Sequence, residues 1–139
     1  MTLSAVMLMV FGLVLALFGF VFTVFGAMFD TLRLQPELAQ ELGSVPESAG
    51  ALVLGLGLVV LAWGTLEVVA AAFVLARRTW ARFTAIVLAV LGTLAGLALS
   101  LPGQGGLNPA LMTATLAFAA GHAFAIWALS RSGAWFSGA

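Results

Sequence analysis

Glu67 and His122 are the two ionisable residues that stand inside long apolar runs, and their types suit proton chemistry. Glu67 lies ten residues before Arg77, and His122 lies nine residues before Arg131. At about 1.5 Å per helical residue, both side chains are then roughly 14–15 Å from an arginine, so we expect them at one depth of a membrane. Because a charge at mid-membrane costs about 2.5–3.5 kcal/mol, we expect the Glu67 carboxyl to be protonated or hydrogen-bonded to His122.

Two further residues belong to this predicted polar layer. Thr93 follows Arg82 by eleven residues, close to the same depth. Trp63 precedes Glu67 by four residues, which is one helical turn, so its indole N–H can donate to the carboxyl. Such a layer could relay protons or anchor a substrate or a quinone-like headgroup. It could also simply join two helices, with a contribution of about 0.6 kcal/mol per hydrogen bond.

Residues for other chemistries are missing from the sequence. There is no cysteine, which excludes disulfides and thiolate metal sites. The single histidine cannot supply two axial haem ligands within one chain. Motifs of zinc proteases, nucleophile elbows and phosphate loops do not occur. We therefore predict no metal, no cofactor and no enzymatic activity.

The composition is that of an integral membrane protein. The chain has 139 residues, 63% hydrophobic and 7% charged, with a mean hydropathy of +1.21. Soluble domains carry about 25% charged residues. Five arginines, no lysine and zero net charge leave no basic patch for nucleic acid. We expect its partners to be the lipid bilayer and either other membrane subunits or copies of itself.

The apolar runs predict an all-α integral membrane protein, an antiparallel bundle of four transmembrane helices in one membrane domain over 1–139. A span needs roughly 20 apolar residues. The first run lacks the positive start and cleavage site of a signal peptide, so we expect it to be retained. The helices are expected at about 3–29, 48–77, 80–100 and 108–130, with an amphipathic outer segment at 34–43.

The arginines predict the orientation of these helices. Four of the five lie between the second and third helices or just after the fourth, and only Arg33 lies at the other end. Arginine is enriched on the cytoplasmic side of membrane proteins. We therefore expect a multi-pass chain with both termini in the cytoplasm and residues 30–47 facing outward.

Small residues and phenylalanines recur at helical spacing. In lipid, helices associate through close contact over small residues, because no hydrophobic drive brings them together. The glycines expected at helix contacts are Gly12, Gly19, Gly26, Gly57, Gly64, Gly92, Gly96 and Gly121. The phenylalanines of the first helix either pack within the bundle or face a partner or a lipid tail. They are Phe11, Phe18, Phe22, Phe25 and Phe29.

The stretch around Glu67 reads G-T-L-E-V-V-A-A-A-F-V-L-A-R-R-T-W-A-R. Over residues 57–98 the chain resembles small bacterial four-helix membrane proteins of the DoxX-like type and related actinobacterial families. These share a glutamate inside the second helix, an arginine-bearing turn and an alanine-rich third helix. DoxX-like chains usually carry an arginine early in the first helix, where this chain has no charge before Asp30. The resemblance implies a four-helix bundle in the bacterial cytoplasmic (inner) membrane, associated with redox or respiratory partners, with Glu67 as its key residue.

The small size and the many packing surfaces favour a non-catalytic accessory or assembly subunit of a larger membrane complex. The alternative is a transporter or channel that moves protons or a small solute through Glu67 and His122. Because a monomer of this size can hardly enclose a path, that function would require an oligomer. A second alternative is a lipid- or quinone-binding membrane protein.

Overall fold

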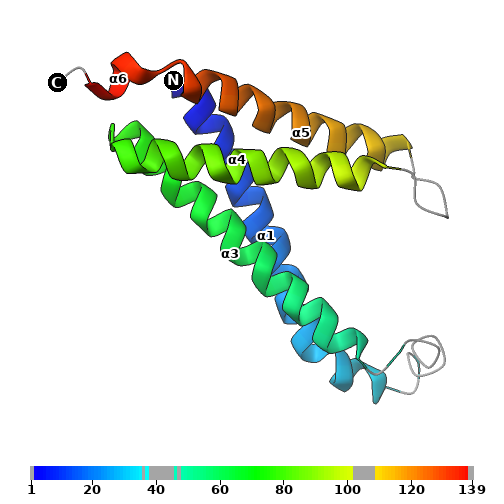
Figure 1. Ribbon diagram of the computed structural model, residues 1–139. Helices are drawn as coiled ribbons and strands as arrows, with labels where there is room; N and C mark the ends of the chain where they lie inside the picture. Colours follow the sequence, from blue (N-terminus) through cyan, green and yellow to red (C-terminus); the bar gives the residue numbers. More distant parts are fainter. Residues whose placement is uncertain (1, 36, 38–45, 47, 102–108, 138–139) are drawn as a thin grey trace. The chain divides into compact units, whose positions relative to one another are not determined.

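Apolar helices make up the protein in the computed structural model, which describes residues 2–35, 37, 46, 48–101 and 109–137 (Figure 1). Four helices are long and apolar enough to cross a bilayer. The predicted all-α fold with four apolar spans is therefore confirmed. The helices are α1 (Thr2–Arg33), α3 (Ala49–Leu75), α4 (Thr79–Ser100), α5 (Pro109–Ser130) and the short α6 (Gly133–Ser137).

The helix ends differ from the predicted ones by a few residues. Helix α1 continues to Arg33, because no glycine or proline interrupts the sequence between Phe29 and Pro36. Helix α6 was not expected. Residues 36 and 38–45 lie outside the described part of the chain, so the amphipathic segment predicted at 34–43 stays a prediction.

Helix α3 ends in a tight turn that carries an arginine in an unusual backbone conformation. The Arg78 N–H donates to the Phe73 carbonyl oxygen and the Arg77 N–H to that of Val74, both at 3.0 Å. This pair of bonds is the Schellman motif, which normally has glycine in the left-handed position. Here that position is Arg77, with φ 58°. The turn leads directly into α4, so α3 and α4 are joined by very few residues.

Contacts within the chain group it into two compact units. The first unit comprises Met1–Phe11 and Leu66–Ala139, and the second comprises Gly12–Thr65. Four helical segments pack as a bundle in the first unit: the start of α1, the end of α3, and α4 and α5. The remainder of α1 and α3 forms the second unit. The single membrane domain over 1–139 stays a prediction.

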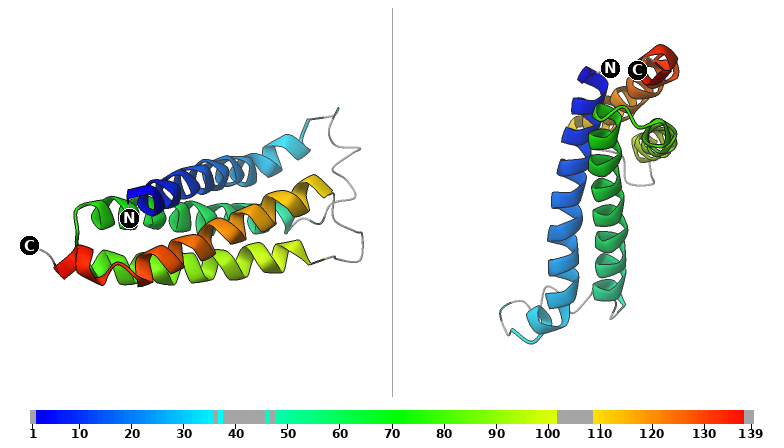
Figure 2. Two further views of the ribbon diagram at one scale, coloured as in Figure 1. Left: turned by 90° about the horizontal axis from the view of Figure 1, so that it is seen from above. Right: turned by 90° about the vertical axis from the view of Figure 1, so that its left-hand side faces the viewer.

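In the second unit, α1 and α3 run antiparallel and side by side (Figure 2). Their contacts run from Gly12 against Gly64 at one end to Phe29 against Gly50 at the other. The two backbones approach so closely that a Cβ atom added to a glycine of this seam would collide with the facing backbone. This holds for Gly19, Gly26, Gly57 and Gly64. The heptad-spaced glycines therefore lie at the helix–helix contact, as close packing in lipid requires.

The phenylalanines of α1 do not share one environment. In the second unit, Phe18, Phe22 and Phe25 are 58%, 47% and 45% exposed. Phe29 is instead 4% exposed, because its ring fits over Gly50, which has no side chain. In the first unit, Phe11 is half-buried against the rings of Phe118 and His122 of α5. Phe18, Phe22 and Phe25 are thus exposed, whereas Phe11 and Phe29 pack within their units, and a partner or lipid face on the exposed three stays a prediction.

In the first unit, α4 and α5 lie side by side and antiparallel (Figures 1 and 2). Alanines of α4 form the buried side of the contact, and Ala81, Ala85 and Ala89 are at most 1% exposed. A Cβ at Gly96 would lie 2.9 Å from that of Ala119. Close packing over small residues therefore also joins these two helices.

Polar bonds join α4 to α5 at both ends of this contact. At one end the hydroxyls of Ser100 and Thr115 are 2.8 Å apart. At the other end, Arg82 donates from Nε to the Leu129 carbonyl oxygen at 2.9 Å and from Nη2 to that of Ser130 at 2.8 Å. The last carbonyls of a helix lack partners within it, so this arginine caps the end of α5.

Candidate functional site

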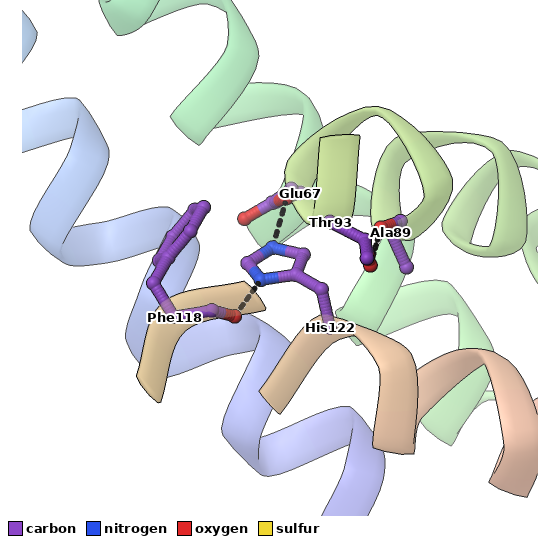
Figure 3. A network of polar contacts seen from close by, with 5 residues as sticks. All are labelled: Glu67, Ala89, Thr93, Phe118 and His122. Atoms are coloured by element: carbon purple, nitrogen blue, oxygen red, sulfur yellow. Dashed lines mark hydrogen bonds and ion pairs between the residues drawn. The ribbon is translucent and has the colours of Figure 1, made fainter. Parts of the chain in front are cut away.

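The structure brings Glu67 of α3 and His122 of α5 together inside the first unit (Figure 3). The His122 Nε2 and Glu67 Oε1 atoms are 2.9 Å apart, at hydrogen-bond distance. The two side chains are 0% and 1% exposed. The residues are 55 positions apart in the chain, so their contact depends on the packing of α3 against α5.

A second hydrogen bond, at Nδ1 of His122, limits where the protons of the pair can lie. Nδ1 lies 2.9 Å from the carbonyl oxygen of Phe118, one turn earlier on α5. A carbonyl oxygen only accepts, so Nδ1 carries a hydrogen. One proton then lies between Nε2 and Oε1: either a neutral Glu67 carboxyl donates to the ring, or a charged ring donates to the carboxylate. In both forms the pair has no net charge, which suits an apolar interior.

Apolar groups surround the His122 ring. The ring of Phe11 stacks on it, with centroids 5.2 Å apart and planes 11° apart, and the Phe118 ring lies at 4.1 Å. Gly92 of α4 faces the same ring, and a Cβ there would collide with it. A Cβ at Gly121 would likewise meet the ring of Phe11. The predicted packing glycines Gly92 and Gly121 thus lie beside the polar pair.

Of the other two residues of the predicted polar layer, Thr93 does not join this bond. The Thr93 hydroxyl donates to the Ala89 carbonyl oxygen at 2.8 Å, within α4 (Figure 3). A hydroxyl in an apolar helix commonly satisfies itself in this way, because lipid offers no acceptor. Trp63 belongs to the second unit and Glu67 to the first, so the indole–carboxyl bond stays a prediction.

The arrangement can hold one proton between two helices, and it excludes water from that proton. Among the described residues, no group of three or more His, Asp or Glu side chains could hold a metal ion. The pair therefore offers two chemical uses. It can join α3 to α5, or it can pass its proton between carboxyl and ring.

A cluster of arginines and aromatic rings lies at the end of the first unit that Arg82 caps. The guanidinium carbon of Arg77 lies 4.4 Å from the Trp135 ring centroid, and that of Arg131 lies 4.9 Å from that of Trp127. Arg82 also lies 5.7 Å from the Phe136 ring. From the sequence, these arginines were expected to orient the chain and to mark the depth of Glu67 and His122, and their contacts with aromatic rings were not predicted. The four-residue offset between Trp127 and Arg131 was an available signal for one of these contacts.

Comparison with known proteins does not place the chain in a family. The resemblance to DoxX-like membrane proteins, with the redox or respiratory partners it implies, therefore stays a prediction. No family model, curated protein or solved structure matches the sequence or the fold.

Proposed function

We propose that the protein is a non-catalytic subunit that helps to assemble or stabilise a larger membrane complex. The observation that carries this proposal is the enclosure of the Glu67–His122 pair, whose side chains are 1% and 0% exposed. A catalytic or transport site must admit a substrate or solute. Phe11, Phe118 and Gly92 instead pack around the ring. The bond is then best explained as one that joins helices.

The outer side of α1 is the surface that we propose for a partner. Val14, Leu17, Phe18 and Val21 line an apolar recess of about 380 Å³ on the second unit. All four side chains are between 44% and 60% exposed. A transmembrane helix of a partner subunit can place its side chains in such a recess, because packing in lipid depends on shape complementarity.

Extraction from the native membrane in a mild detergent tests this role. We expect other polypeptides to co-purify in a fixed ratio, and Phe18→Ala to lower their yield. Phe83→Ala is the matched control, since this phenylalanine is 68% exposed on α4 and does not line the recess. A particle that contains only this chain would contradict the proposal, as would equal losses in the two variants.

Transport by an oligomer is the second candidate, and the shared proton of the Glu67–His122 pair favours it. This function requires that the pair open to water on each side in turn. It predicts a pH-dependent proton flux in liposomes that Glu67→Gln abolishes. Unchanged flux in that variant excludes the role assigned to Glu67. Binding of a lipid or quinone is a third candidate, since Thr93, Leu97 and Leu116 help to line an apolar recess of about 410 Å³.

We further propose that the chain spans the bacterial cytoplasmic membrane with both termini and the 77–82 turn in the cytoplasm. The arginines at this end of the spans support the orientation. Because the chain has no cysteine, single cysteines report on each side without background. Ala76→Cys should react with a membrane-impermeant maleimide only after the cells are opened, and Ser48→Cys should react in intact cells. The opposite pattern would reverse the orientation.

A further inference from the structure

We propose that the arginine end of the first unit binds the phosphate of an anionic phospholipid headgroup. The arginine end comprises Arg77, Arg78, Arg82 and Arg131. Three spans end or begin there, at Leu75, Thr79 and Ser130. The arginines therefore lie at the depth of lipid headgroups. This inference is independent of the accessory role proposed above.

The charge of the first unit is unbalanced. Its two sequence segments contain four arginines and one acidic side chain, that of Glu67. Glu67 is buried and hydrogen-bonded to His122, so it does not neutralise the arginines. The other acidic residues all lie between Asp30 and Glu47, outside this unit. Exposed arginines attract anions, and anionic headgroups are the anions at this depth of a membrane.

One arginine is structural, and the other three are exposed. Arg82 uses Nε and Nη2 to cap α5 through Leu129 and Ser130. It thereby fixes the end of α5 beside the start of α4. Arg77, Arg78 and Arg131 are exposed on the two segments that this cap holds together. The cap thus assembles a cationic surface from the α3–α4 turn and the end of α5.

Aromatic rings position two of these cations. Arg77 lies over Trp135 and Arg131 over Trp127. A cation–π contact engages the face of a guanidinium, whereas a phosphate binds along its N–H edge. Tryptophan rings themselves favour the headgroup region of a bilayer. The two contacts therefore restrain the arginines at the right depth and are compatible with phosphate binding.

The backbone at Arg77 gives a separate reason to assign this residue a role. Its φ of 58° is in the left-handed region, where glycine fits without strain and other residues do not. An arginine here lowers folding stability relative to glycine. Binding of a headgroup phosphate accounts for an arginine at this position in place of glycine, which would fit the backbone without strain.

The test compares lipid binding by the full chain in a neutral detergent. Phosphatidylglycerol and phosphatidylcholine are added separately, and binding is followed by native mass spectrometry and tryptophan fluorescence. We expect phosphatidylglycerol to bind in preference to phosphatidylcholine. Each arginine near a membrane surface contributes about a fivefold change in affinity, from about 1 kcal/mol. The triple variant Arg77→Gly, Arg78→Gln, Arg131→Gln should therefore bind about a hundredfold more weakly.

Three controls separate this proposal from its rivals. Arg77→Gly suits the left-handed backbone, and Arg82 stays in place, so the triple variant should fold; unchanged circular dichroism checks this. Arg33→Gln removes one charge outside the first unit and should leave binding unchanged. Inorganic phosphate should not displace the lipid at millimolar concentration. Equal binding of both lipids, loss of binding in Arg33→Gln, or saturation by phosphate alone would each overturn the proposal.

Discussion

Two glycines of α3, Gly57 and Gly55, provide a sharp test of the helix packing. They are two residues apart, and their surroundings are opposite. A Cβ added at Gly57 would lie 2.7 Å from the Thr23 Oγ1 atom and 2.8 Å from the Phe22 carbonyl carbon. A Cβ added at Gly55 would have nothing within 4 Å. Gly55→Ala is therefore a matched control for Gly57→Ala.

The expected difference in stability follows from this geometry. Ordinary contacts begin at 3.4 Å, and the colliding atoms of Phe22 and Thr23 include backbone atoms, which cannot rotate away. The backbone nitrogen of Thr23 would lie closer still, so helices α1 and α3 must separate by roughly 1 Å, which forfeits up to about half of the dispersion energy at each contact of the seam. With the usual range for overpacking, we expect Gly57→Ala to lower the free energy of unfolding by about 1–3 kcal/mol relative to Gly55→Ala. The gain in helix propensity is the same in both variants and cancels.

Reversible unfolding of the purified protein by SDS in detergent micelles, followed by circular dichroism, measures this difference. Gly55→Ala should match the unsubstituted chain or exceed its stability by up to about 1 kcal/mol. Gly57→Leu should be more damaging than Gly57→Ala, since its larger side chain needs a wider separation. If the two alanine variants unfold within about 0.5 kcal/mol of each other, the close approach of α1 and α3 is refuted.

The remaining predictions concern the first unit. Glu67→Gln should be tolerated, because its side-chain amide can donate a hydrogen bond to His122 Nε2. Glu67→Leu removes that bond and should lower the free energy of unfolding by about 1 kcal/mol. Equal stability of the two variants would contradict the bond. Gly92→Ala should lower the free energy of unfolding by about 1–3 kcal/mol, because the added Cβ meets the His122 ring. The same contact should shift the NMR signals of that ring, and unshifted signals would contradict the contact. Arg82→Gln removes the cap of α5 and should lower the free energy of unfolding by about 1–2 kcal/mol. Amide hydrogen exchange at the end of α5 should then become faster, and unchanged exchange would exclude capping by Arg82.

The main lines of the fold could be read from the sequence because the signals are strong and local. Apolar runs bounded by charges or by Pro-Gly pairs mark each span, since a bilayer requires a minimum length of apolar helix. The depth of a residue in the membrane could also be estimated, because the rise per residue of an α-helix is fixed. Counting from Arg77 and Arg131 therefore placed Glu67 and His122 at one level, and the structure brings them into contact.

Features that depend on tertiary contacts could not be read in the same way. Spacing puts Phe11 and Phe29 on the same side of α1 as Phe18, but it does not say which neighbouring element covers each one. Likewise, Arg82 is an orienting charge in the sequence, and only the packing of α4 against α5 turns it into a helix cap. Left-handed backbone at Arg77 was also not predictable, because glycine is the residue that usually signals it.

The regular spacing of the glycines between α1 and α3 leaves the alignment of these helices underdetermined. Because glycines recur every seven residues on both, a slide of seven residues, about 10 Å, would again present a glycine to the facing helix at most positions. Such a repeat specifies which faces of the two helices meet, but it does not specify which glycine of α1 lies beside which residue of α3. Glu67 has no such duplicate on α3, and its histidine is the single one in the chain. The Glu67–His122 bond therefore selects one position of α3 along its axis relative to α5, which a glycine repeat cannot do, so that its removal should yield shifted alignments of these two helices as well as a weaker fold.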